Sequence, residues 1–214
     1  MEIASLRKAK EKNIISDKAQ LLLEEYIYRL EDNRVPVIFN LRHLRKLLNI
    51  KKIDQSRFFG NYRENSYIKF EIPKKSGGHR TIHAPKDDLK LIQLWIKEYI
   101  LDKFKPSNYA MGFVKGRSIA DNAKLHVGNE LVINIDLKDF FPSIKYYDVY
   151  KIFKYIGYTD EVSSLLTKLC TTENNVLPQG SPASPALSNL VSLKLDKRLS
   201  KLAESANSTY TRYA

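Results

Sequence analysis

Apolar residues recur at helical spacing in the first part of the chain. Residues 21–30 (LLLEEYIYRL) carry them about every 3.6 positions, which predicts an amphipathic helix. Ser16 or Asp17 is available as its N-cap, and the helix is expected to end near Asn33. A shorter helix is predicted within residues 40–50 (NLRHLRKLLNI), where four leucines share one face. Its basic residues form either a solvated face or a nucleic-acid contact.

Two strand-like runs follow in residues 67–85 (YIKFEIPKKSGGHRTIHAP). A turn with two adjacent glycines separates them, which is the composition of a β-hairpin whose turn needs positive φ. The two arms are expected to bring Lys74, Lys75 and Arg80 near one another.

The strongest amphipathic pattern covers residues 88–104 (DLKLIQLWIKEYILDKF) and predicts a helix. Trp95 lies on its apolar stripe with Ile92, Ile96 and Ile100. Its indole is therefore expected in the core rather than as a stacking platform for bases.

The period changes to two at Leu131. In residues 131–136 (LVINID) alternate side chains share a face, which predicts a buried strand that ends at Asp136. Further on, Ser184 and Pro185 are predicted as the N-cap and first turn of a helix that continues to Leu202. The last residues, TYTRYA, are predicted as a strand. Helices and strands without regular βαβ alternation favour the α+β class.

Composition narrows the function classes. The 214 residues are 43% hydrophobic, enough for a real core in one domain or two closely joined lobes. Cys170 is the only cysteine, so an intrachain disulfide and a cysteine metal cluster are excluded, and we expect a buried structural thiol. No apolar run is long enough to cross a bilayer, and the N-terminus lacks the apolar core of a secretion signal; we therefore expect a cytoplasmic protein with no membrane partner.

The formal charge of +12 is concentrated in one part of the chain. Residues 1–130 hold 26 Lys and Arg against 16 Asp and Glu, whereas residues 131–214 hold 10 against 8. A basic excess favours a polyanionic partner through phosphate neutralisation, but a solvated surface has the same composition. Charge alone does not decide between them.

Two acids close to the predicted strand suggest chemistry. Asp136 ends the strand, and Asp139 follows beside two phenylalanines. A bound cation offsets the cost of desolvating a carboxylate, and hard oxygen ligands suit magnesium. Metal-assisted phosphoryl transfer is therefore a candidate, with a turn-forming or helix-capping role as the alternative.

Two other segments have features that bind phosphates. The loop in residues 177–189 (LPQGSPASPALSN) leads into a helix, so its backbone N–H groups can approach a phosphate or a base pair. The cationic hairpin can clamp a triphosphate, although alone it is equally an ordinary charged hairpin.

The order of these segments resembles a known family. IPKKSGGHR, GFVKGRSI, INIDLKDFFPSI, LPQGSPASPALSN and YTRYA, in this order, resemble the successive motifs of prokaryotic reverse transcriptases. The resemblance runs from about Tyr67 to the last residue. Residues 122–126 (NAKLH) are similar to the NAxxH pattern of retron enzymes, which favours that branch over group II intron maturases.

The resemblance implies the α+β fingers and palm of a right-hand polymerase. Residues 1–66 would be an N-terminal helical segment, residues 67–130 the fingers, and residues 131–214 a partial palm. The implied activity is magnesium-dependent transfer of deoxynucleotides onto a DNA or RNA primer on an RNA template. A structured non-coding RNA partner and a role in antiphage defence are also implied.

The resemblance implies individual roles as well. Asp136 would be the first metal-binding aspartate, with the backbone carbonyl of Leu137 as a neighbouring ligand. Phe141 would stand under the sugar, where its ring would clash with a ribose 2′-OH. Asp139 would either assist near the triphosphate or cap the turn into Pro142.

The remaining implied contacts are with the nucleotide and the nucleic acid. Gln179 would lie against the incoming nucleotide, and Arg80 with Lys74 or Lys75 would hold its phosphates. The expected nucleic-acid contacts are Lys115, Arg117, Gly180 and Ser181.

One departure from the family pattern changes the expectation for these 214 residues. Tyr213 and Ala214 match the first two positions of the family's YxDD strand, and the sequence then stops. Two-metal phosphoryl transfer needs acids from both strands, which Asp136 alone does not supply. We therefore expect an inactive piece of a longer enzyme, without its thumb.

Several alternatives stay open. They are a group II intron maturase, an RNA-templated RNA polymerase or untemplated nucleotidyl transferase on the same palm, a non-catalytic nucleic-acid-binding module, and a basic α+β protein without enzymatic activity.

Overall fold

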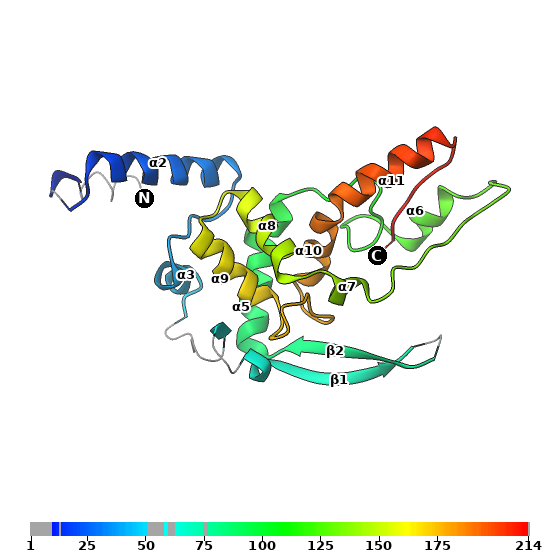
Figure 1. Ribbon diagram of the computed structural model, residues 1–214, viewed down its shortest axis with the longest axis horizontal. Coiled ribbons are helices and arrows are strands. Elements are labelled where there is room, and N and C mark those ends of the chain that lie inside the picture. The colour runs from blue at the N-terminus through cyan, green and yellow to red at the C-terminus, as the bar shows by residue number, and fades with distance from the viewer. Residues whose placement is uncertain (1–9, 13, 51–57, 60–62, 75–76, 214) are drawn as a thin grey trace.

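The computed structural model describes residues 10–12, 14–50, 58–59, 63–74 and 77–213. Lys75, one of the three predicted hairpin cations, lies outside them. Helix α2 (Asp17–Asp32) projects from one end of the molecule, and a two-stranded hairpin extends along one side (Figure 1). The other helices form the body between them.

The two N-terminal helices begin at side-chain caps. The Ser16 side chain accepts a hydrogen bond from the backbone N–H of Ala19, and α2 ends at Asn33, as predicted. Helix α3 (Leu41–Leu47) begins at Asn40, whose side chain accepts from the N–H of His43 (2.9 Å). Both predicted helices are confirmed.

The predicted hairpin is confirmed by antiparallel pairing of β1 (Tyr67–Pro73) with β2 (His79–Pro85). A short 3₁₀ turn, η1 (Arg63–Ser66), precedes it. Gly77 and Gly78 have φ of 88° and 76°, the left-handed conformation that glycine adopts without a steric penalty. The turn therefore requires its glycines.

Helix α5 (Asp87–Tyr99) and the 3₁₀ turn η2 (Leu101–Lys103) account for the strongest amphipathic pattern. Trp95 is partly buried against the core and stacks on Tyr99, with ring centroids 5.3 Å apart. The prediction that Trp95 packs against the core is thus confirmed.

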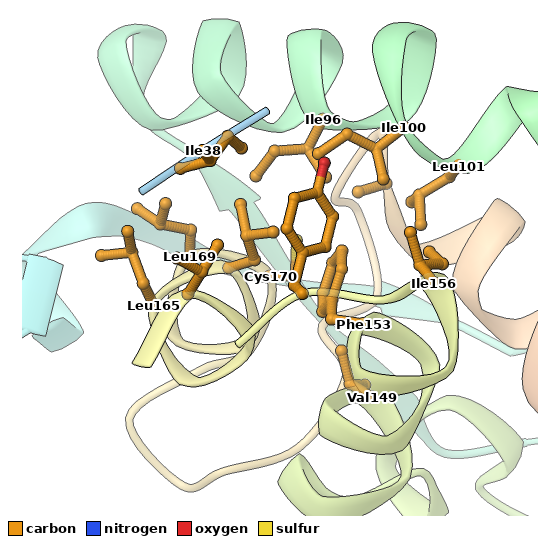
Figure 2. Packing of buried hydrophobic residues seen from close by; sticks show 14 of the residues in the cluster. Ile38, Ile96, Ile100, Leu101, Val149, Phe153, Ile156, Leu165, Leu169 and Cys170 are labelled. Atoms are coloured by element: carbon orange, nitrogen blue, oxygen red, sulfur yellow. The ribbon is translucent and has the colours of Figure 1, made fainter. Parts of the chain in front are cut away.

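Helix α9 (Asp160–Cys170) packs against both α8 (Tyr146–Ile156) and α5, and buried side chains of all three helices form the core. Figure 2 shows Phe153 and Cys170 among the isoleucines and leucines of these helices. Cys170 is fully buried, and burial raises the pKa of its thiol. The expected structural thiol is confirmed.

The helix predicted from Ser184 to Leu202 is two helices. Helix α10 (Ser184–Val191) and helix α11 (Leu193–Ser205) meet at Ser192. The cap prediction is also wrong, because Ala183 is the N-cap and Ser184 is the first helical residue; Pro185 does lie in the first turn, as predicted. Two short helices complete the fold, α6 (Ile119–Lys124) and α7 (Phe140–Ser143).

The buried strand predicted for residues 131–136 is absent. This segment runs between α6 and α7 without pairing to any strand in the described part of the chain. Ile133 and Ile135 are 73% and 85% exposed. A strand needs a partner to satisfy its backbone N–H and C=O groups, and the described residues supply none.

The strand predicted for the last residues is also wrong in extent. In the described portion of that segment, Arg212 forms a single parallel bridge with Ala110. The only sheet among the described residues is therefore the hairpin, in a protein that is otherwise helical. No helix in the described ranges has the length and apolar character needed to span a membrane.

Candidate nucleotide and nucleic-acid site

Strand β2 of the hairpin is hydrogen-bonded to the LPQG loop (residues 177–180). The backbone N–H of His83 donates to the carbonyl oxygen of Gln179 at 2.7 Å. Gly180, the next residue, has φ of 113°, and a Cβ added there would lie 2.8 Å from Cγ2 of Ile82. The loop therefore approaches β2 more closely than any residue with a side chain allows.

Replacing Gly180 with alanine is expected to push the hairpin away from the loop. The added methyl group meets Ile82 and the carbonyl oxygen of His83, and the left-handed backbone adds strain. We expect a loss of about 2–4 kcal/mol in the free energy of unfolding, measured by urea denaturation. Gly128→Ala is the matched control, because Gly128 also has positive φ but no atom within 4 Å. Equal losses in the two variants would contradict the close packing.

Backbone hydrogen bonds also connect the LPQG loop to residues 140–144 (FFPSI) and the start of α8. The N–H of Leu177 donates to the carbonyl of Ile144 (2.9 Å), and the N–H of Tyr146 donates to the carbonyl of Asn175 (2.8 Å). Backbone hydrogen bonds thus connect the hairpin, the LPQG loop and the segment that carries Phe141. Three motifs that are distant in sequence share one framework.

A fourth motif reaches Phe141 through an aromatic contact. Phe113, in GFVKGRSI, packs edge-on against the Phe141 ring with centroids 6.1 Å apart, and Phe140 does so at 5.7 Å. Phe113 has φ of 58°, an uncommon conformation for a bulky residue. The Phe141 ring is therefore held on two sides.

The described hairpin cations share one face of the ribbon. Arg80 lies opposite Ile72, and Lys74 continues the alternation two residues beyond Ile72, with its N–H bonded to the carbonyl of Gly78. Diagonal neighbours of this kind are roughly 7–8 Å apart. Both side chains are exposed, so they are available to a polyanion.

Charged groups fasten the base of the hairpin. Arg63 donates from Nη2 to the backbone carbonyls of Lys168, Thr171 and Thr172 at the end of α9, and burial lowers the pKa of its guanidinium. Lys69 pairs with Glu173 at 2.6 Å. Partial burial alone would raise the pKa of Glu173, but the hydrogen bond from Lys69 and the nearby positive charge outweigh it and lower the pKa.

Asp136 lies exposed at the end of the unpaired segment, next to Leu137. Its carboxylate makes no hydrogen bond or ion pair with the described residues. No group of three or more potential metal-binding side chains occurs in the part of the chain that the structure describes. The metal-binding role of Asp136 and of the Leu137 carbonyl therefore stays a prediction.

Asp139 has a left-handed backbone (φ 50°) immediately before α7. Its side chain makes no capping hydrogen bond; its backbone carbonyl instead accepts from the N–H of Ser143. Asp139 is thus the N-cap residue of α7 without a side-chain capping bond, and both roles considered for its carboxylate stay predictions.

The predicted nucleic-acid contacts differ in availability. Lys115 and Gly180 are exposed. Arg117 donates to the backbone carbonyls of Asn108 and Ala110, and Ser181 is buried with its hydroxyl donating to Gln93 Oε1 (2.7 Å). All four roles remain predictions, but within the described ranges only Lys115 and Gly180 are without such internal bonds.

Sequence reasoning missed several buried polar residues that hold the site together. Gln93 donates to Tyr67 and to the carbonyl of Leu169, below the hairpin. Asn189, Asp196 and Arg212 form a second buried network beside GFVKGRSI. One feature of the sequence could have indicated Gln93: it is a polar residue on the otherwise apolar helix face that carries Leu89 and Ile96.

Comparison with known proteins agrees with this convergence of motifs. Residues 72–214 match the family model described as reverse transcriptase (RNA-dependent DNA polymerase). The chain belongs to the retron-type reverse transcriptase family. Membership implies the polymerase fingers and palm fold.

Individual relatives support the retron branch. The chain is similar to the Retron Ec86 reverse transcriptase of Escherichia coli, with 40% identity over 194 residues that cover 89% of this chain and 60% of that protein. Similarity to the Retron Mx162 reverse transcriptase of Myxococcus xanthus is 36% over 207 residues, covering 87% and 42%. The chain thus spans about half the length of these relatives.

An intron-encoded relative is more distant. The chain is 29% identical over 171 residues to the Putative COX1/OXI3 intron 1 protein of Saccharomyces cerevisiae, covering 72% of this chain and 20% of that protein.

Proposed function

We propose that this chain is the fingers and part of the palm of a magnesium-dependent RNA-directed DNA polymerase of the retron type. The full enzyme would add deoxynucleotides to a primer on an RNA template, with a structured non-coding RNA as a partner. The segment boundaries at residues 66/67 and 130/131 belong to this proposal, as does inactivity of the 214 residues alone.

The observation that carries the proposal is the joining of three motifs by backbone hydrogen bonds. His83 bonds to Gln179, and Leu177 bonds to Ile144, three residues after Phe141. The cationic ribbon, the LPQG loop and the aromatic segment therefore border one region. A region with cations, an amide and an aromatic wall suits a nucleoside triphosphate.

The donor set fits part of a magnesium site. Asp136 and the carbonyl of Leu137 are hard oxygen ligands on an exposed segment, and Asp136 has no competing ion pair among the described residues. Magnesium bound there would neutralise phosphate charge and activate the primer 3′-OH. Acidic ligands beyond these two residues are needed for a second ion.

The other residues would bind and select the nucleotide. Lys74 and Arg80 would neutralise its phosphates, and Gln179 would lie against its base or sugar. The ring of Phe141, held by Phe113 and Phe140, would occupy the space that a ribose 2′-OH needs.

Replacing Phe141 with valine is the test of substrate class. In the protein as its gene encodes it, we expect discrimination for dNTPs over rNTPs to fall by roughly 10- to 100-fold, because the steric clash is relieved. The measurement is competitive incorporation on an RNA template. Phe104→Val is the control and is expected to keep the ratio, because Phe104 is a partly buried phenylalanine outside the four motifs. An unchanged ratio in Phe141→Val, with incorporation intact, would remove the assignment of this residue.

A group II intron-type enzyme is the second candidate, supported by the similarity to the yeast intron protein. The two candidates differ in the RNA that they copy. Priming within a structured non-coding RNA favours the retron type, whereas copying of intron RNA favours the alternative. A non-catalytic binding module would bind RNA without incorporating any nucleotide.

A further inference from the structure

A buried ion pair fixes the segment that follows α11. Arg212 donates to Asp196 through two nitrogens, Nε to Oδ1 (2.8 Å) and Nη2 to Oδ2 (3.0 Å). Asp196 is 0% and Arg212 7% exposed. Tyr210 adds a hydrogen bond from its hydroxyl to Asp196 (2.9 Å). The returning segment is therefore clamped along the helix (Figure 1).

The same arginine is tied to the GFVKGRSI motif. Its backbone N–H donates to the carbonyl of Tyr109 (2.8 Å), and its carbonyl accepts from the N–H of Met111 (2.7 Å). Its Nη2 also donates to Asn189 Oδ1, and Asn189 Nδ2 donates to the carbonyl of Gly112 (3.2 Å). The clamp thus reaches the residue before Phe113.

A contribution to folding stability alone does not explain the buried Asp196–Arg212 ion pair. Desolvating two charges offsets most of their attraction, so a buried ion pair adds little net stability compared with well-packed apolar residues. Its bidentate geometry does impose one relative position on the two groups. The segment it fixes leads directly to Phe113, whose ring packs against Phe141.

We propose that Asp196, Arg212 and Asn189 are positioning residues for the sugar pocket. They hold the backbone of Gly112 and Phe113, which in turn holds the Phe141 ring at the place where it meets the sugar of the incoming nucleotide. The inference rests on the proposed function and extends it to residues that do not touch the substrate.

The decisive variant is Asn189→Ala, which cuts the link to Gly112 and leaves the Asp196–Arg212 pair in place. In the protein as its gene encodes it, we expect dNTP-over-rNTP discrimination to fall about fivefold to tenfold, as loss of the buried hydrogen bond to Gly112 allows. Asp196→Asn is expected to have at least the same effect. Leu166→Ala, in the core, is the stability control and is expected to leave the ratio unchanged.

Amide hydrogen exchange tests the clamp without any activity. In Asp196→Asn, the amides of Met111 and Arg212 are expected to exchange faster, while those of α8 and α9 keep their protection. Faster exchange with an unchanged ratio in both variants would overturn the positioning role. Unchanged exchange would overturn the clamp itself. Absence of incorporation by the unaltered protein would instead remove the proposed function, and the exchange result would still decide the clamp.

Discussion

Asp136→Asn is expected to lower the rate of dNTP incorporation by the full encoded protein at least about 1000-fold, which corresponds to roughly 4 kcal/mol of lost transition-state stabilisation. Asparagine keeps the size of the side chain but removes the negative charge that holds a divalent cation. Because Asp136 is exposed and unpaired among the described residues, its replacement leaves the packing intact. Single-turnover primer extension on an RNA template measures the effect.

A stability measurement and a control variant show whether the loss of incorporation is specific to the Asp136 carboxylate. The variant is expected to keep its thermal unfolding midpoint, since the Asp136 side chain is exposed and makes no hydrogen bond or ion pair with the described residues. Asp160→Asn is the control. Asp160, the first residue of α9, is another exposed acid, and its carboxylate pairs with Lys154 of α8. Incorporation by Asp136→Asn within tenfold of the unaltered protein would remove Asp136 from the metal site.

Phe153→Ala is expected to reduce the free energy of unfolding by about 3–5 kcal/mol. Its ring is fully buried on α8, where Figure 2 shows it below Ile96 and Ile100. Truncation removes apolar contacts and leaves a cavity that the surrounding helices fill only in part. Urea denaturation followed by circular dichroism measures the loss.

A neighbouring aromatic residue provides the control. Tyr155 lies on the same helix but is 83% exposed, so Tyr155→Ala is expected to change stability by less than about 0.5 kcal/mol. Similar losses in both variants would mean that helix propensity, rather than the core in Figure 2, determines the effect.

Local signals in the sequence predicted much of this fold. The caps at Ser16 and Asn33, the glycines of the hairpin turn and the apolar stripe around Ile92 each act within a few residues, and the structure confirms them. The burial of Cys170 followed from the apolar surroundings that its helical pattern indicated.

The features that were predicted wrongly or not at all do not follow from local sequence. Residues 131–136 have the composition of a strand, but pairing requires a second segment, and their alternation carries no information about one. The break at Ser192 lies within a continuous apolar pattern and has no glycine or proline. The pairing of Asp196 with Arg212 could not be predicted from the sequence either, because each residue by itself is typical of a solvated surface charge.

The order of motifs identified the family, whereas the positions of individual side chains did not follow from it. Phe141 and Gln179 lie on segments joined by hydrogen bonds, as their predicted roles require. Ser181 and Arg117 were expected at a nucleic-acid surface, but their side chains bond to Gln93 and to backbone carbonyls. A motif fixes the residue type, and packing then decides which of its atoms remain available.

Cleavage of the polypeptide by bound ferrous iron tests the central claim, that Asp136 holds a divalent cation. Ascorbate and hydrogen peroxide are added to the iron-loaded protein. The iron that replaces magnesium splits the peroxide into hydroxide and a hydroxyl radical as Fe²⁺ becomes Fe³⁺, ascorbate returns the iron to Fe²⁺, and the radicals break peptide bonds near the ion. In the full encoded protein, we expect cleavage close to residues 134–138, competition by magnesium, and loss of the cleavage in Asp136→Asn. Cleavage confined to other segments, or unchanged in Asp136→Asn, would contradict it.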